Sequence, residues 1–165
     1  MTLPSKQKQI IGFIGWLLVS FVASAIGAIA SIQARSFYSG LVQPDWAPPG
    51  SVFGPVWTTL FFMMAVAAWL IWRKGGFSVN RIALNLFLVQ LAVNAVWSWF
   101  FFVWNLGAIA LINILILWVF IVATMALFWR VQKVAALLLV PYLAWVSFAG
   151  FLNYAVWQLN PSLLG

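Results

Sequence analysis

Long apolar stretches, separated by short polar or charged segments, make up almost the whole chain. One stretch lies between Lys8 and Arg35, and a second lies between Asp45 and Arg73. A helix needs roughly 20 apolar residues to cross the hydrocarbon core of a bilayer. Each of these two stretches therefore predicts one membrane-spanning helix.

The interval between Arg81 and Arg130 contains no charged residue. It is too long for one crossing and suits two crossings joined by a tight turn. We expect that turn at 105–107 (NLG), because Asn and Gly tolerate the positive φ at which many helices stop. A last apolar run follows Lys133. The pattern predicts an all-α integral membrane protein, one domain over 1–165 formed by a single bundle of five transmembrane helices, at about 10–32, 48–72, 82–104, 107–129 and 134–158.

Composition supports a membrane protein. Hydrophobic residues make up 66% of the chain and charged residues only 5%, whereas a soluble domain carries about a quarter charged residues. The net charge of +7 raises the question of nucleic acid, which clustered Lys and Arg bind by releasing counterions. Here the basic residues are spread along the edges of apolar runs, where topology-setting charges lie. We therefore expect a lipid bilayer and no nucleic acid as partner.

The basic residues also predict the orientation. Arg35, with Asp45 nearby, lies on one side of the predicted bundle, and the other basic residues lie on the side of the N-terminus. This bias predicts a cytoplasmic N-terminus and an external C-terminus in a bacterial inner membrane. Apolar residues 10–32 form a longer run than the hydrophobic region of a signal peptide, so we expect a retained first helix.

Residues that carry conventional chemistry are missing. The chain has no His, no Cys and one acidic residue. This excludes a carboxylate pair, a Ser–His arrangement and a cluster of metal ligands. A proton relay needs buried ionisable groups, which the predicted helices lack. We expect no catalytic residue of the usual kinds, no metal and no resident cofactor.

The segment QPDWAPPGSVFGPVW (43–57) holds the one acidic residue and four of the seven prolines. Asp45 suits a helix N-cap, and Pro48-Pro49 make the entry to the second helix stiff. Pro55 is expected about one turn inside that helix, where it bends the helix or frees a carbonyl. The segment is either a rigid helix entry whose tryptophans anchor at the membrane surface, or the cap of a cavity.

Two predicted helices each place polar and aromatic residues on one face, which we expect to turn away from lipid. Such faces serve either for hydrogen bonds between helices or for a pocket with a few polar groups. Because each face holds a Trp and an Asn, the two faces together favour a shared cavity more than either face would alone. The residues are Gln90, Asn94, Trp97 and Phe101 in the third helix and Pro141, Trp145, Ala149, Asn153 and Trp157 in the fifth.

The first helix has small residues four apart. The pairs Ser20–Ser24, Ala23–Gly27 and Ser24–Ala28 fit the small-xxx-small pattern of closely packed membrane helices. Packing within the bundle is the favoured interpretation, and a homodimer interface is the alternative.

Three stretches, PDWAPPGSVFGPVW, QLAVNAVWSWFFF and PYLAWVSFAGFLNYAVW, carry a resemblance that covers essentially the whole chain. They resemble bacterial-type members of the tryptophan-rich sensory protein/translocator protein family, also called the peripheral-type benzodiazepine receptor family. The resemblance implies a five-helix bundle, usually a homodimer, with a pocket beneath the first loop. The implied ligands are porphyrins and other tetrapyrroles, with sterols and benzodiazepine-type compounds for some members.

The resemblance also assigns residues. The tryptophan pair implicated in light-dependent porphyrin breakdown in some members matches Trp57 and Trp145 of this chain. From its charge and position, Arg35 is a candidate for contact with a propionate. Two departures concern the sterol motif, where Gln158 replaces a basic residue, and the dimer interface, where Asn85 and Val89 replace glycines. The implied ligand-binding residues are Trp46, Pro48, Pro49, Trp57, Asn94, Trp97, Trp145, Ala149 and Asn153.

Three functions follow as hypotheses. The first is a membrane receptor or carrier that senses, transports or sequesters porphyrin. The second is photo-oxidative degradation of bound porphyrin by the tryptophans. The third is a regulatory scaffold for a protein partner, with the pocket as a ligand-gated switch.

Overall fold

The computed structural model describes residues 4–32 and 34–165, and for Arg35 the backbone alone. Within this part, the structure is helical without strands, and five helical segments are long and apolar enough to span a membrane. The predicted all-α membrane fold is confirmed. The spans are Lys6–Ala30, Gly50–Trp72, Gly76–Val103, Gly107–Val131 and Lys133–Leu159.

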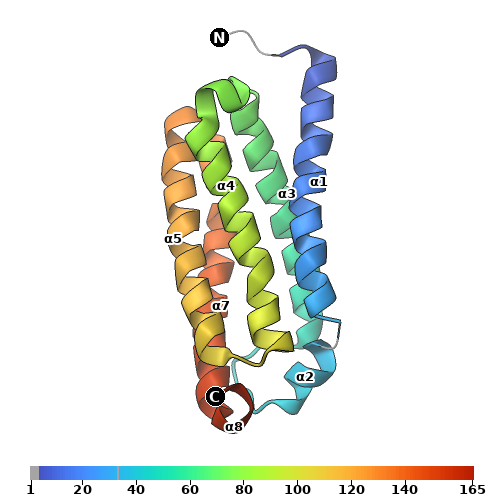
Figure 1. The fold of residues 1–165 in the computed structure, drawn as a ribbon, viewed down its shortest axis with the longest axis vertical. Helices are drawn as coiled ribbons and strands as arrows, with labels where there is room; N and C mark the ends of the chain where they lie inside the picture. Colours follow the sequence, from blue (N-terminus) through green and yellow to red (C-terminus); the bar gives the residue numbers. More distant parts are fainter. Residues whose placement is uncertain (1–3, 33) are drawn as a thin grey trace.

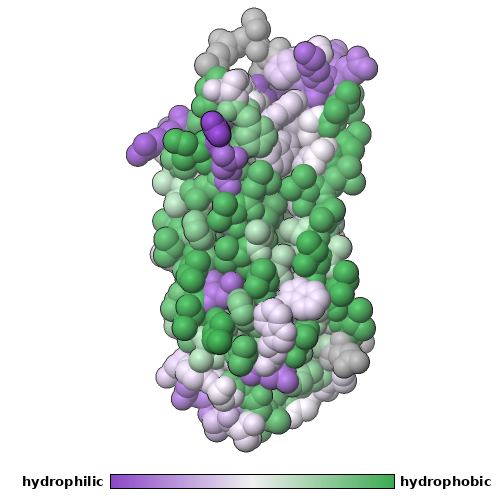
Figure 2. All heavy atoms as spheres, in the orientation of Figure 1, coloured by the Kyte–Doolittle hydropathy of each residue, from purple (hydrophilic) through white to green (hydrophobic). Residues whose placement is uncertain are grey.

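The spans contain the long helices α1, α3, α4, α5 and α7, which run side by side along the long axis of the molecule (Figure 1). The short helices α2 and α8 lie at the end where the chain terminates, opposite the N-terminus. An apolar surface covers the middle of the view in Figure 2, with hydrophilic residues gathered toward the ends. The helices are α1 (Lys6–Ala30), α2 (Ala34–Gly40), α3 (Phe53–Trp72), α4 (Gly76–Ser98), α5 (Gly107–Val131), α6 (Lys133–Leu137), α7 (Val140–Leu159) and α8 (Pro161–Leu164).

The helices pack around a core of small and large apolar side chains. On α3, Ala65, Ala67 and Ala68 are fully buried, so neighbouring helices approach its backbone closely. Gly12 of α1 lies directly against the ring of Trp72 and leaves no room for a side chain there. Close packing of this kind stabilises membrane helices, since lipid provides no hydrophobic drive for their association.

The turn between α3 and α4 and the turn before α5 use different residues for the positive-φ backbone conformation. Between α3 and α4, Gly75 and Gly76 have φ values of 119° and 61°. In the predicted 105–107 turn, Asn105 has φ 54°, and Gly107 begins α5. Gly107 serves close packing instead, because a Cβ there would lie 2.7 Å from Cδ1 of Trp157. The end of the preceding span widens into a π-helical turn, Trp99–Val103.

The start of the second span corrects the prediction for Asp45 and Pro55. Asp45 is exposed in a turn closed by the N–H of Ala47 and the carbonyl of Pro44 (2.9 Å), and it caps no helix. The 3₁₀ turn Gly50–Val52 precedes α3. Pro55 is therefore the third residue of α3, where an N–H has no helical partner, so the proline fits the first turn and lies less deep in the helix than predicted.

Pro141 is predicted to bend the last span, and in the structure it interrupts the helix. The helix is divided into α6 and α7, and Pro141 stands in the first turn of α7. At the division, the N–H of Leu139 donates to the carbonyl of Ala136 at 3.0 Å, three residues back. The proline ring excludes an uninterrupted α-helix here because it removes a donor and clashes with the preceding turn.

Candidate functional site

A cavity of about 420 Å³ lies inside the bundle, in the half nearer α2 and the C-terminus. The long helices all contribute to its wall, and α2 contributes Ala34 and Tyr38. Small-molecule sites have volumes of this order and mostly apolar walls. The cavity reaches the exposed residues Ala28 of α1 and Gly54 and Thr58 of α3. It therefore opens sideways between two helices that pack against each other.

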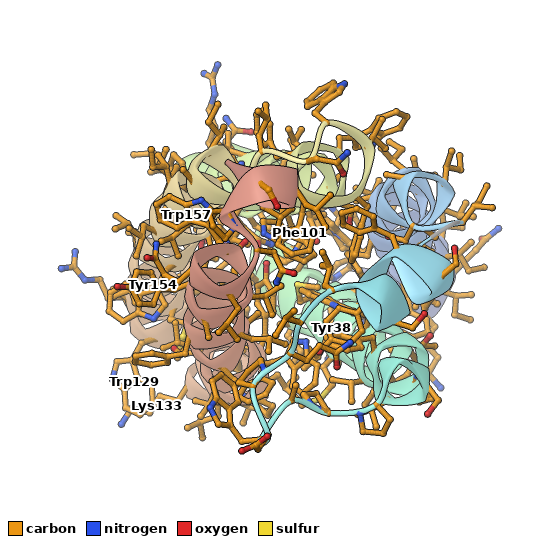
Figure 3. The ribbon with its side chains drawn as sticks, turned by 90° about the horizontal axis from the view of Figure 1, so that it is seen from below. Tyr38, Phe101, Trp129, Lys133, Tyr154 and Trp157 are labelled. Atoms are coloured by element: carbon orange, nitrogen blue, oxygen red, sulfur yellow. The ribbon has the colours of Figure 1, made fainter. Side chains whose placement is uncertain are left out.

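Aromatic rings form much of the wall. Trp57, Trp97 and Trp145 all line the cavity from three different helices. Trp97 stacks on Phe101 with ring centroids 5.4 Å apart, and Trp145 and Phe53 form an edge-to-face pair with centroids 5.8 Å apart. Figure 3 shows Phe101 near the middle of the bundle in the end-on view. These contacts fix the ring planes, so the wall presents preformed aromatic surfaces.

Hydrogen bonds between helices hold the polar residues of the wall. Asn94 donates from Nδ2 to Oη of Tyr142 at 2.9 Å, and Tyr142 donates to Oε1 of Gln90 at 2.8 Å. Trp97 donates from Nε1 to Oδ1 of Asn153 at 3.1 Å. The two predicted uses of these faces, hydrogen bonding and a pocket, therefore coexist. Asn94 and Asn153 line the cavity while their amide groups also join helices.

Two buried donors of the cavity wall have no partner in the described part of the chain. They are the Tyr38 hydroxyl and the indole N–H of Trp145. An unpaired buried donor costs about 1–3 kcal/mol. Burial also raises the pKa of Tyr38, so its hydroxyl stays protonated. A ligand with an acceptor atom would satisfy either donor.

The structure brings together most of the residues that the sequence singled out. Trp46, Pro48 and Pro49 lie outside the cavity wall. Trp46 is 52% exposed and forms an edge-to-face pair with Phe148, with ring centroids 5.9 Å apart. The loop that carries these residues runs across the end of the bundle in the view of Figure 3. The predicted residues that do line the cavity are Trp57, Asn94, Trp97, Trp145, Ala149 and Asn153.

The Arg35 side chain, predicted to contact a propionate, lies outside the described part of the chain. Among the described residues, no group of three His, Cys, Asp or Glu side chains gathers into a metal site.

Sequence reasoning missed Tyr38 and the contribution of α1. The small-residue face of α1 turns into the bundle, as the favoured interpretation had it, and Ser20 and Ala23 are buried. Ala23, Ser24 and Gly27 also line the cavity, a use that their spacing alone does not distinguish from packing. Tyr38 carried no periodic signal, since it belongs to a short helix outside the spans. Homodimerisation stays a prediction, and the buried part of the α1 face is already occupied within the chain.

Comparisons with known proteins identify relatives of this chain. A family model, the TspO/MBR family, matches residues 15–158. Tryptophan-rich protein TspO of Chlorobaculum tepidum is 47% identical over 132 residues, covering 78% of this chain and 82% of the relative. The human translocator protein is 40% identical over 130 residues, with 78% and 77% covered. The tryptophan-rich sensory protein of Cereibacter sphaeroides is 35% identical over 149 residues, with 88% and 92% covered.

The family model spans nearly the whole chain, including the helices that enclose the cavity. With five membrane-spanning helices and relatives of this similarity, the chain belongs to the TspO/MBR family.

Proposed function

We propose that this protein is a membrane receptor or carrier that binds porphyrins and related flat apolar molecules in the cavity. Sensing, transport or sequestration of the porphyrin would follow from that binding. The names of two relatives, translocator protein and tryptophan-rich sensory protein, support a receptor or sensor role in the membrane. The porphyrin as ligand rests on the chemistry of the cavity.

One observation carries the proposal: an aromatic cavity holds two buried donors that lack partners. Trp57, Trp97 and Trp145 offer ring faces on which a macrocycle stacks. The hydroxyl of Tyr38 and the N–H of Trp145 suit acceptor atoms on the ligand. The amides of Asn94 and Asn153, expected to orient the ligand, are engaged in bonds between helices. We assign them the role of positioning the aromatic wall.

The side opening fits a ligand that partitions into the bilayer. Its rim is formed by the exposed residues Ala28, Gly54 and Thr58, whose short side chains leave space between α1 and α3. A macrocycle with one edge in the cavity would extend through this gap toward lipid. Sterols and benzodiazepine-type compounds are further candidate ligands by shape and polarity, although Gln158 stands where the proposed sterol motif has a basic residue.

Quenching of tryptophan fluorescence by protoporphyrin IX tests the proposal in purified protein. Saturable quenching is expected after correction for inner-filter absorption. The double variant Trp57→Phe/Trp145→Phe should bind at least tenfold more weakly, because two stacking faces and one donor change. Trp129→Phe is the matched control, since Trp129 is 49% exposed and absent from the cavity wall. Unquenched fluorescence, or equal affinity in the double variant, would refute the proposal.

Light-dependent breakdown of bound porphyrin is a second candidate, favoured by the position of Trp57 and Trp145 in one cavity wall. Molecular oxygen, activated by the illuminated porphyrin, would be the oxidant. The indoles of Trp57 and Trp145 would lie beside the bound porphyrin, where the oxidation needs them. The test is product formation under illumination in air. We expect product in the light and none in the dark, in the double variant or without oxygen.

For the membrane arrangement, we propose a homodimer in a bacterial inner membrane with the N-terminus in the cytoplasm. Basic residues gathered at the helix ends on the side of the N-terminus support that orientation. They are Lys6, Lys8, Arg73, Lys74, Arg81, Arg130 and Lys133. Reporter fusions at the two ends of the chain test the orientation, and crosslinking in membranes tests the dimer.

A further inference from the structure

The cavity is covered at its outer end by a lid, which we define as α2 and the loop 41–49. Tyr38 of the lid lines the cavity, and in Figure 3 it lies on the side of α2 that faces the middle of the bundle. Its ring and the ring of Phe53 of α3 form an edge-to-face pair with centroids 5.6 Å apart. Any movement of the lid therefore moves part of the cavity wall.

One side chain from the far end of the sequence holds this lid. Asn160 follows α7, and its Oδ1 accepts a hydrogen bond from the N–H of Val42 at 2.8 Å. Its Nδ2 donates to the carbonyl of Val42, also at 2.8 Å. A single amide thus pairs with both backbone groups of one lid residue, 118 positions away in the sequence.

Asn160 is itself rigidly placed. The same Nδ2 also donates to the carbonyl of Val156 at 2.8 Å, and the backbone carbonyl of Asn160 accepts from the N–H groups of Leu163 and Leu164. Pro161 follows it and disfavours helical backbone at Asn160, whose φ of −130° and ψ of 54° end α7. Asn160 is 4% exposed, whereas Val42 is 59% exposed. The fixed partner is therefore Asn160, and the movable partner is the loop.

We infer that Asn160 is a latch that keeps the lid closed and so sets the rate at which ligand enters and leaves the cavity. Asn160 is absent from the cavity wall, so it acts through the lid as a positioning residue. The inference rests on the proposed function only in that a ligand exchanges through this end of the cavity.

A latch makes a distinctive kinetic prediction. When a lid must open before exchange, the opening equilibrium multiplies the association and dissociation rates alike and leaves the affinity almost unchanged. Asn160→Ala removes both bonds to Val42, and the loss of two ordinary hydrogen bonds corresponds to roughly tenfold easier opening. Asn160→Asp keeps the acceptor for the Val42 N–H but turns a carboxylate oxygen toward the Val42 carbonyl, so we expect at least the same tenfold. Gln158→Ala, at an exposed position of α7, is the control.

Two measurements on the full chain in lipid nanodiscs test the latch. The first needs no ligand: because the chain has no Cys, Ala149→Cys places a single thiol in the cavity wall. Its reaction rate with N-ethylmaleimide should rise about tenfold when Asn160→Ala is added. The second follows protoporphyrin IX binding and release by stopped flow, where both rates should rise together.

Unchanged thiol reactivity and unchanged exchange rates in Asn160→Ala would overturn the latch and assign exchange to the side opening between α1 and α3. A loss of affinity with an unchanged association rate would also overturn it. If Asn160→Ala does not fold, Asn160→Asp decides by the same two measurements. Should protoporphyrin IX fail to bind the wild-type chain, the proposed function fails, and the thiol measurement still decides on the latch.

Discussion

Trp97 donates its indole N–H to the side-chain oxygen of Asn153, 3.1 Å away, and Asn153 donates in turn to the carbonyl of Gly107 at 3.0 Å. These two bonds connect α4, α7 and α5 at the lower end of the cavity. Asn153 is only 2% exposed, so water does not compete for these two hydrogen bonds. Asn153 therefore fixes the plane of Trp97, on which Phe101 stacks.

Replacing Asn153 with Ala should destabilise the bundle and loosen the cavity wall. The change leaves the buried N–H of Trp97 without a partner and removes the side-chain bond to the carbonyl of Gly107, at a cost of roughly 2–3 kcal/mol. Thermal unfolding in detergent, followed by circular dichroism, measures the effect. Asn85→Ala is the control, since Asn85 is exposed on α4. Equal unfolding temperatures for the two variants would contradict this role.

Gly107→Ala tests the close approach of α5 and the end of α7. The added Cβ would lie 2.7 Å from Cδ1 of Trp157 and 3.0 Å from the carbonyl oxygen of Leu164. Such overpacking costs about 1–3 kcal/mol, so the variant should unfold at a lower temperature. Gly15→Ala has open space at its Cβ and should be neutral or stabilising by up to about 1 kcal/mol. The reverse order of the two variants would show that α5 and α7 pack differently.

The architecture could be predicted from the sequence wherever the membrane allows only one arrangement of the chain. The uncharged interval between Arg81 and Arg130 has the length of two spans, and the backbone turns at Asn105. Polar residues at membrane depth have to face inward, which is why Gln90 and Asn94 are buried. These inferences need only the length of a span and the cost of exposing polar groups to lipid.

Details that depend on contacts between distant residues could not be predicted in this way. Asp45 and Pro55 fit an earlier helix start by local preference, and the actual start at Phe53 depends on how the loop crosses the bundle. The pairing of Val42 with Asn160 leaves no periodic trace in either segment. Small residues of α1 satisfy a packing pattern and a cavity wall equally well, because both require short side chains.

Tyr38→Phe should separate the stability of the free protein from ligand affinity. The Tyr38 hydroxyl is buried without a partner in the described chain, so its removal should leave unfolding unchanged or slightly less favourable. If the hydroxyl donates to the ligand, affinity for protoporphyrin IX should fall about threefold, as expected for one ordinary hydrogen bond. Tyr154→Phe, at an exposed position of α7 that points outward in Figure 3, should change neither property.

The same hydroxyl predicts a simple pH dependence. Burial raises the pKa of Tyr38 above its ordinary value of 10.0, and the donor is the protonated form. The affinity lost in Tyr38→Phe should therefore be the same at every pH from neutral up to that ordinary value. Fluorescence titrations of both proteins across this range measure it. A difference that vanishes near neutral pH would mean that another group donates to the ligand.

Ala149→Leu tests whether ligand occupies the cavity itself. Ala149 is half-buried in the cavity wall, and three added carbon atoms would fill space between the aromatic rings. Filling a cavity adds apolar contacts at about 0.8 kcal/mol per buried CH₂, so the ligand-free variant should be at least as stable as wild type. Binding of protoporphyrin IX should weaken at least tenfold, because the ring faces are no longer accessible.

Ala144→Leu is the matched control for this test. Ala144 lies on the same helix, is exposed, and is absent from the cavity wall, so the same added side chain should leave binding unchanged. Fluorescence quenching gives affinity and thermal unfolding gives stability for both variants. A stable Ala149→Leu protein that binds with wild-type affinity would place the ligand outside the cavity, since no macrocycle stacks on rings that a leucine side chain covers.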